Sequence, residues 1–267
     1  MKSAILIAGH GSRYERAQQA LEHIVQTIQE RDDSIPVRLA YTSHKIRTQL
    51  NEDGSEAKSP QEVLNDFKAM GITHVVMQSL HVIRAKEYSI LTDLAERLRG
   101  DEDGFVDMQV GMPLLAGTDD IENVCQAFIS LIPEDMPKNE ALLFMGHGSI
   151  YVDDPAYEAL NSHLHDKGVN IYVGTMDSTP DLPEVIRRMK ADNITHIHLR
   201  PFLFGAGFHA TKDLVGKDDS WKNILEAAGF TCEPEIVGLG ENERFLDVWI
   251  AHLDHAMKKL NKRCCSC

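Results

Sequence analysis

Short apolar runs alternate along the chain with longer segments in which apolar residues recur at helical spacing. A short buried run predicts a β-strand, and apolar positions three and four apart predict a helix that packs one face on a sheet. Two helix starts, at Ser12–Glu15 and Ser59–Glu62, have the residue pattern of a capping box. In the first half we expect strands at 4–8, 37–41, 72–77 and 108–114, and helices at 17–28, 46–50, 59–70, 87–99 and 119–131.

The same order begins again after a polar linker at 133–139. Strands that alternate with helices are typical of parallel sheets with helices on both faces, so we predict an α/β protein. The Asp154-Pro155 pair predicts the start of the first helix in this half. We expect strands at 141–145, 170–173, 194–199 and 235–238, and helices at 156–165, 180–191, 221–228 and 242–259.

The two halves also share sequence. Gly9-His10-Gly11-Ser12 matches Gly146-His147-Gly148-Ser149, and Gly71–Val75 matches Asn193–Ile197. Continuing the second match without gaps places Glu87 opposite His209. We therefore predict two similar lobes, 1–132 with His10 and Glu87, and 133–267 with His147 and His209, related by a pseudo-twofold axis with a cleft between them.

All four of these residues follow predicted strands, and open α/β sheets bind ligands at the carboxyl ends of their strands. Imidazole suits borderline divalent ions, so His147, His209 and Glu87 predict a metal site of two histidines and one carboxylate. Each residue also has a plain structural explanation. A Gly-His-Gly sequence can be a tight turn, and a glutamate at a helix start is favoured by the helix dipole. We interpret His74 and His196, inside strands, as structural.

Composition narrows the function classes. The formal net charge of −14 argues against general nucleic-acid binding. The chain contains no apolar run near the roughly 20 residues of a membrane span, and its N-terminal run is too short for a signal peptide. We therefore expect a cytoplasmic protein without a membrane partner. The five cysteines do not form a disulfide framework, and the Cys264–Cys267 tail is either a soft-metal ligand or, the simpler reading, a frayed end.

The sequence lacks a phosphate loop, a dinucleotide fingerprint and a nucleophile elbow, so we expect no organic cofactor. At the level of motifs, the chain resembles the class II tetrapyrrole chelatases, in particular the sirohydrochlorin cobaltochelatases of the CbiK type. The matching stretches are Tyr41-Thr42-Ser43 with Ile46-Arg47, Gln78–Ile83 leading to Glu87-Tyr88, Pro113-Leu114-Leu115, Phe144–Gly148, Ala206–Ala210 with Asp213, Ser220-Trp221-Lys222 and Gly238–Glu241.

The resemblance implies two flavodoxin-like lobes and an enzyme that inserts Co²⁺, its substrate metal, into sirohydrochlorin in anaerobic cobalamin synthesis. It also implies metal ligands at the positions of His147, His209 and Glu87. Fe²⁺, for siroheme, and Ni²⁺ are alternative metals, and a non-catalytic metal or tetrapyrrole carrier is the alternative class. The sequence leaves the oligomeric state open, a homo-oligomer included.

Two positions depart from the CbiK type. His10 lies where such chains usually have another residue, so it is an additional ligand, a proton acceptor or a relic of duplication. Asp177 stands where related chains usually have glutamate, and a role in the cleft is an open alternative. Sirohydrochlorin carries many carboxylates, and arginines near strand ends could pair with them as a local basic patch. The candidates are Arg13, Arg47, Arg84 and Arg200.

Overall fold

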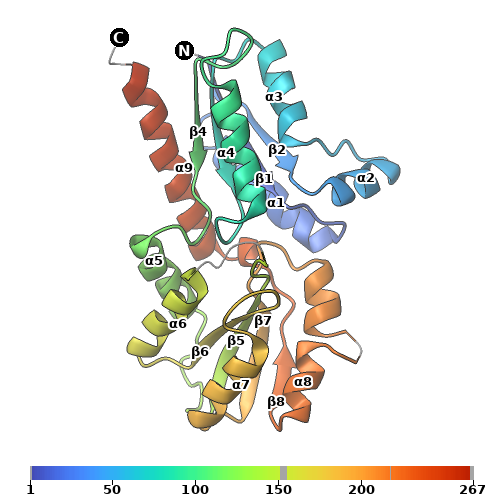
Figure 1. The fold of residues 1–267 in the computed structure, drawn as a ribbon, viewed down its shortest axis with the longest axis vertical. Helices are drawn as coiled ribbons and strands as arrows, with labels where there is room; N and C mark the ends of the chain where they lie inside the picture. Colours follow the sequence, from blue (N-terminus) through green and yellow to red (C-terminus); the bar gives the residue numbers. More distant parts are fainter. Residues whose placement is uncertain (1, 151–154, 217, 265–267) are drawn as a thin grey trace. The chain divides into compact units, whose positions relative to one another are not determined.

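The computed structural model describes residues 2–150, 155–216 and 218–264, which form two compact units. The first unit comprises residues 1–114 and 246–267, and the second comprises 115–245 (Figure 1). Asp154 and the cysteines of the tail after Cys264 lie outside the described residues, so the predictions about them stay open. Within the described residues, no helix has the length and apolar character needed to cross a membrane.

The first unit is built on a four-stranded parallel sheet with the strand order β2-β1-β3-β4. Leu6 and Ala8 of β1 pack with apolar residues of α3 and α4, while Ile5 lies with Ile28 of α1 and Leu253 of α9. Helices therefore cover both faces. The elements are β1 (Ser3–Gly9), α1 (Glu15–Gln29), β2 (Val37–Tyr41), α2 (His44–Glu52), α3 (Pro60–Ala69), β3 (His74–Ser79), α4 (Lys86–Leu98), β4 (Asp107–Gly111) and α9 (Glu243–Cys264).

The second unit repeats this topology in the order β6-β5-β7-β8, again with all strands parallel. One face packs against Val185 of α7 and Trp221 of α8. On the other face, the ring of Phe128 of α5 packs tilted against that of Phe144 of β5, with ring centroids 4.4 Å apart. The elements are α5 (Thr118–Ile129), β5 (Glu140–Gly146), α6 (Ala156–Asp166), β6 (Ile171–Thr175), α7 (Leu182–Ala191), β7 (His196–Pro201), α8 (Trp221–Ala227) and β8 (Thr231–Pro234).

Equivalent strands occupy equivalent places in the two sheets, because each unit arranges its strands in the order second, first, third, fourth. The predicted α/β class with two similar parallel-sheet lobes is thereby confirmed. The units divide at Leu114/Leu115 and again at Phe245/Leu246, whereas the sequence predicts one division between 132 and 133. The second division arises because most of α9 returns to the first unit, where Trp249 Nε1 donates to the His81 carbonyl at 3.4 Å.

Two local predictions differ from the structure, and one short element was not predicted. Ser12 does not cap α1; its Oγ accepts from the Tyr14 amide at 3.1 Å, and the helix begins later, at Glu15. The last strand of the second unit is β8 at Thr231–Pro234, not 235–238, because it is these four residues that pair with His196–Leu199 of β7. A short π-helix at Ala210–Leu214 was not predicted. By contrast, the capping box at Ser59 and Glu62 is present as predicted.

Candidate functional site

The first unit brings together the two residues that the sequence assigned to it. His10 follows β1 directly, and Glu87 lies in the first turn of α4, which follows β3. His10 Nδ1 is 3.5 Å from Glu87 Oε1, with the two side chains 55% and 33% exposed. Since β1 and β3 are parallel neighbours, their carboxyl ends meet at one edge, which explains the contact between residues 77 positions apart.

Glu87 is held in its ionised form. The contact with His10 is the largest cause, and it lowers the pKa of Glu87 to about 2 although partial burial opposes the shift. His81 lies on the same loop. Its Nδ1 is 2.8 Å from Ser79 Oγ and its Nε2 is 3.2 Å from Thr42 Oγ1, and burial lowers the pKa of His81 to about 4. At neutral pH the loop thus offers an anionic carboxylate beside a neutral imidazole.

The second unit brings together its own pair, His147 and His209, at the equivalent edge. Their ring centroids lie 4.9 Å apart, and the rings are nearly perpendicular. Their exposed fractions are 46% and 38%, so both rings are open to solvent. His147 follows β5, and His209 follows β7 and precedes the π-helix. The side chains are therefore positioned by two parallel neighbours, as in the first unit.

Each ring of this pair is anchored through Nδ1. Asp213 Oδ2 lies 2.6 Å from His209 Nδ1, and Asp177 Oδ2 lies 3.4 Å from His147 Nδ1. The Gly148 carbonyl is also 3.2 Å from His147 Nδ1. A carboxylate or carbonyl on one ring nitrogen fixes the ring and makes the other nitrogen the better metal ligand. Nε2 is therefore the atom that each ring can offer to a metal ion.

Backbone conformation and crowding explain why a glycine follows both His10 and His147. Gly11 has φ +93° and Gly148 has φ +74°, a left-handed region that residues with a Cβ rarely adopt. A Cβ at Gly148 would also approach Ser178 Cβ to 2.7 Å. Each Gly-His-Gly turn also accepts one hydrogen bond at the same place, the histidine carbonyl. Ser43 N donates to the His10 carbonyl, and Asp177 N donates to the His147 carbonyl.

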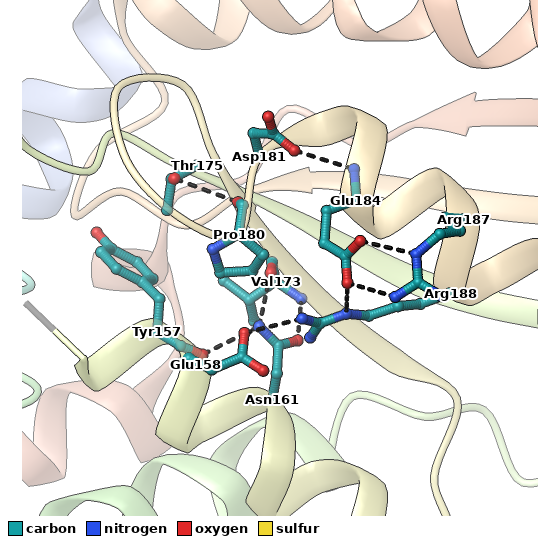
Figure 2. A network of polar contacts seen from close by, with 10 residues as sticks. All are labelled: Tyr157, Glu158, Asn161, Val173, Thr175, Pro180, Asp181, Glu184, Arg187 and Arg188. Atoms are coloured by element: carbon teal, nitrogen blue, oxygen red, sulfur yellow. Dashed lines mark hydrogen bonds and ion pairs between the residues drawn. The ribbon is translucent and has the colours of Figure 1, made fainter.

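A network of polar contacts fixes the loop that carries Asp177 (Figure 2). The loop is closed where the Thr175 amide donates to the Pro180 carbonyl at 2.8 Å, and Asp181 then caps α7. Asn161 of α6 is buried and exchanges hydrogen bonds with Val173, whose strand β6 lies at the edge of the sheet. These contacts join α6, β6 and α7, so Asp177 projects from a loop with fixed ends.

The four arginines proposed as carboxylate partners have different surroundings. Arg13 is exposed and pairs with Asp53 at 3.0 Å, and Arg84 is exposed with its guanidinium 3.5 Å from Met112 Sδ. Arg47 instead donates to two backbone carbonyls at the end of β2. Arg200 is largely buried and pairs with Glu235 at 2.6 Å. Arg13 and Arg84 are thus the more accessible of the four.

Sequence reasoning assigned no role to Asp213 or His81, although both residues occur in the quoted motifs. The spacing from His209 to Asp213 is i,i+4, which on a helical turn places the carboxylate against the ring, and this signal could have identified it. His81 carries no such signal. Burial lowers its pKa, and its ring nitrogens lie against the hydroxyl of Ser79 at the end of β3 and that of Thr42 after β2, neighbours that only the fold brings together.

Comparison with known proteins gives a consistent result. The model of the cobalt chelatase (CbiK) family matches residues 3–258. A sirohydrochlorin cobaltochelatase, CbiKC, from Nitratidesulfovibrio vulgaris is 35% identical over 261 residues, covering 97% of this chain and 92% of the relative. The sirohydrochlorin cobaltochelatase of Salmonella typhimurium is 31% identical over 262 residues, covering 96% and 97%.

Solved structures agree on the fold. SirB from Bacillus subtilis with Fe³⁺ superposes with a TM-score of 0.62 at 17% identity, covering 97% of this chain and 99% of SirB. A sirohydrochlorin chelatase SirB in complex with cobalt gives a TM-score of 0.61 at 14% identity, with 98% of each chain covered. The parallel sheets and the family match together place this chain in the cobalt chelatase (CbiK) family.

Proposed function

We propose that this protein is a sirohydrochlorin cobaltochelatase, an enzyme that inserts Co²⁺ into sirohydrochlorin in cobalamin synthesis. The observation that carries the proposal is the His147–His209 pair, with ring centroids 4.9 Å apart at the ligand-binding edge of a parallel sheet. Family membership supports the same reaction, because two relatives more than 30% identical over almost their full length bear this name.

In this proposal His147 and His209 bind the incoming Co²⁺ through Nε2, and Glu87 is the carboxylate of the ligand set. Two imidazoles and a carboxylate suit Co²⁺, as they suit Fe²⁺ and Ni²⁺, so the donors select a class of ion rather than one metal. Asp213 and Asp177 hold the rings through Nδ1. A ligand set with open positions can pass its metal on, which a chelatase needs and a closed structural site prevents.

Insertion also needs proton acceptors. Each Co²⁺ that enters the macrocycle replaces two N–H protons, and these must leave the ring. An imidazole nitrogen that does not bind the metal can accept such a proton, so His10 is a suitable acceptor. Glu87 Oε1 lies 3.5 Å from His10 Nδ1, so a proton taken up by His10 would face a carboxylate. We therefore assign His10 the role of a proton acceptor that works with Glu87.

The macrocycle combines an apolar ring with carboxylates at its rim. Phe208, whose ring centroid lies 5.7 Å from that of His209, and Ile150, three residues after His147 in the chain, are apolar side chains 54% and 71% exposed, and they suit the ring face. Lys212, whose ammonium lies 5.4 Å from the Phe208 ring, suits a rim carboxylate. Arg13 and Arg84 are suited to the same role, and such local cations offset the net charge of −14.

Catalytic turnover distinguishes a chelatase from a non-catalytic metal or tetrapyrrole carrier. Sirohydrochlorin with a many-fold excess of Co²⁺ over protein, kept anaerobic, should give continuous conversion to the cobalt complex, followed by visible absorbance and corrected for the uncatalysed rate. Conversion that stops at one equivalent per chain would identify a carrier and contradict the proposal.

The choice of metal is tested in the same assay with Fe²⁺ and Ni²⁺ side by side with Co²⁺. We expect the largest kcat/KM for Co²⁺. A clear preference for Fe²⁺ would assign the chain to siroheme synthesis instead.

A further inference from the structure

A second group of metal-binding side chains lies in the second unit, at the opposite end of the sheet from His147 and His209. One ring nitrogen of His196, one of His198 and one carboxylate oxygen of Glu140 all lie within 4.8 Å of one another. Glu140 is the first residue of β5, and His196 is the first residue of β7. The seven residues of β5 separate this group from the His147 turn by about 20 Å at about 3.3 Å per residue.

The strand geometry places these side chains on one face. Residues two apart in a strand point the same way, so His196 and His198 share a face, and their ring centroids are 4.9 Å apart. Glu140 is the register partner of His196 on β5, and Glu233 is the register partner of His198 on β8. Three adjacent strands thus direct two imidazoles and two carboxylates to the same place, on backbone that the sheet holds rigid.

The distances suit a divalent ion after small side-chain movements. His198 Nε2 is 2.9 Å from Glu140 Oε2, and His196 Nε2 is 3.7 Å from Glu233 Oε2. Metal–ligand bonds of about 2.0–2.2 Å in a tetrahedral site put neighbouring ligand atoms about 3.4 Å apart. The observed separations lie on both sides of that value. His196, His198 and Glu140 are 26%, 18% and 24% exposed, so an ion could reach them from solvent.

Charge favours a cation at this place. Arg200 pairs with Glu235 at 2.6 Å and neutralises it. Glu140 and Glu233 then carry two negative charges around two imidazoles that are neutral when they act as ligands. A divalent cation would balance those charges, and the partly buried Glu140 carboxylate gains from such a partner, while Glu233 is 65% exposed.

The internal repeat provides a natural contrast. At the same register positions, the first unit has Ser3 for Glu140 and His74 for His196. It has Val76 for His198 and Gln109 for Glu233, since these pairs occupy corresponding places in β3 with β4 and in β7 with β8. The shared fold therefore does not require this set of ligands.

We propose that Glu140, His196 and His198, with Glu233 as a fourth ligand, form a structural binding site for a borderline divalent ion such as Zn²⁺ or Co²⁺. The ion would join three strands and fix β8, the four-residue strand at the edge of the sheet. This site is separate from chelation, and His196, which the sequence led us to interpret as structural only, becomes one of its ligands.

The test uses the full-length protein, freed of metal by chelator and titrated with Zn²⁺ in a calorimeter. We compare wild type, the His196→Gln/His198→Gln variant and the control His165→Gln, which alters an imidazole that is 83% exposed. We expect the wild type and the control to bind one more equivalent than the double variant. Loss of the two imidazoles should weaken the affinity for that additional Zn²⁺ ion by more than about tenfold. The rate of cobalt insertion should not change.

A second measurement keeps the proposal testable if the double histidine variant fails to fold. Zn²⁺ should raise the Tm of the wild type, and Glu140→Gln, which keeps the side-chain shape, should lose most of that rise. Equal Zn²⁺ stoichiometry and an equal Tm increase in wild type and variants would overturn the proposal. In that case the histidines and glutamates would serve only as ion pairs.

Discussion

Asp213 illustrates how a single carboxylate can determine what its neighbour binds. It lies 2.6 Å from His209 Nδ1, which fixes the ring and leaves Nε2 as the donor atom for a metal. Carboxylates in this position also raise the basicity of the coordinating nitrogen. The metal affinity of the site should therefore depend on Asp213 even though it is not itself a ligand.

Replacing Asp213 with Asn tests this dependence. The amide keeps the size of the side chain but loses its charge, so we expect the KM for Co²⁺ to rise about 10–100-fold, the range typical of such outer partners. The fold should be unchanged by circular dichroism. Asp166→Asn is the matched control, because Asp166 lies 3.9 Å from the exposed His165. An unchanged KM in Asp213→Asn would show that the contact does not tune the ligand.

His81 shows a second effect at this scale, the cost of keeping an imidazole neutral. Burial lowers the pKa of His81 to about 4, below the value of about 6.5 for an unfolded histidine. Between these pH values the unfolded chain binds the extra proton, so the free energy of unfolding falls as the pH falls. Stability is therefore fully present above about pH 6.5 and is lost as the pH drops towards 4.

The corresponding prediction concerns His81→Gln. We expect the wild type to lose about 1–2 kcal/mol between pH 7 and pH 4.5 through this group, less than the full shift implies because the residue is partly exposed. The variant should lack this part of the acid destabilisation, although it is less stable at pH 7. Urea unfolding at both pH values measures the difference. Identical pH slopes for the two proteins would contradict the assignment to His81.

At the scale of elements, the Gly-His-Gly turns position the functional histidines. The left-handed φ of Gly148 and the closeness of Ser178 leave no room for a Cβ. The same turn accepts a hydrogen bond from the Asp177 amide at 2.9 Å. A change at Gly148 should therefore displace both His147 and Asp177.

Gly148→Ala is expected to reduce cobalt insertion strongly and to lower the free energy of unfolding by about 1–2 kcal/mol or more, since the left-handed conformation alone costs that amount. Gly168→Ala provides the matched control. Gly168 has φ +68°, but a Cβ there would meet no atom within 4 Å. The control should share the cost in stability and keep its activity. Equal activity in the two variants would show that crowding at Gly148 does not position the site.

At the level of elements, much of the fold and part of the candidate site could be predicted from the sequence. The alternation of apolar runs with helical periodicity predicted the order of strands and helices, and the two histidines that follow predicted strands led us to expect His147 near His209. The contact of His10 with Glu87 was not predicted, because the sequence grouped Glu87 with His147 and His209. The start of α1 and the place of β8 were predicted wrongly. At the start of α1, the Ser12 hydroxyl accepts from the Tyr14 amide two residues on, a local alternative to capping that the residue pattern does not distinguish. The place of β8 is set by its pairing with β7, a long-range contact that no sequence window contains.

The strand register is what the sequence could not provide. His196 looked structural because it lies inside a predicted strand. Only the pairing of β7 with β5 and β8 brings Glu140 and Glu233 to the same face. Long-range neighbours of this kind become visible once the sheet order is known.

At the scale of the molecule, two units of one topology carry different side chains at equivalent places. The first unit has His10 with Glu87, and the second has His147 with His209. The two units therefore offer different chemistry at one place in the fold, an imidazole with a carboxylate in the first and two imidazoles in the second. The charge of −14 fits an enzyme that meets its polyanionic substrate only through local cations.

The most direct test of this account is the rate of cobalt insertion by His147→Ala, measured anaerobically with saturating sirohydrochlorin and compared with His165→Ala, a control on an exposed imidazole. Loss of a metal ligand should lower kcat/KM for Co²⁺ by more than about 100-fold while the Tm stays close to that of the wild type. A rate within about threefold of the wild type, less than about 0.7 kcal/mol in transition-state stabilisation, would contradict the assignment of His147 as the metal-binding residue.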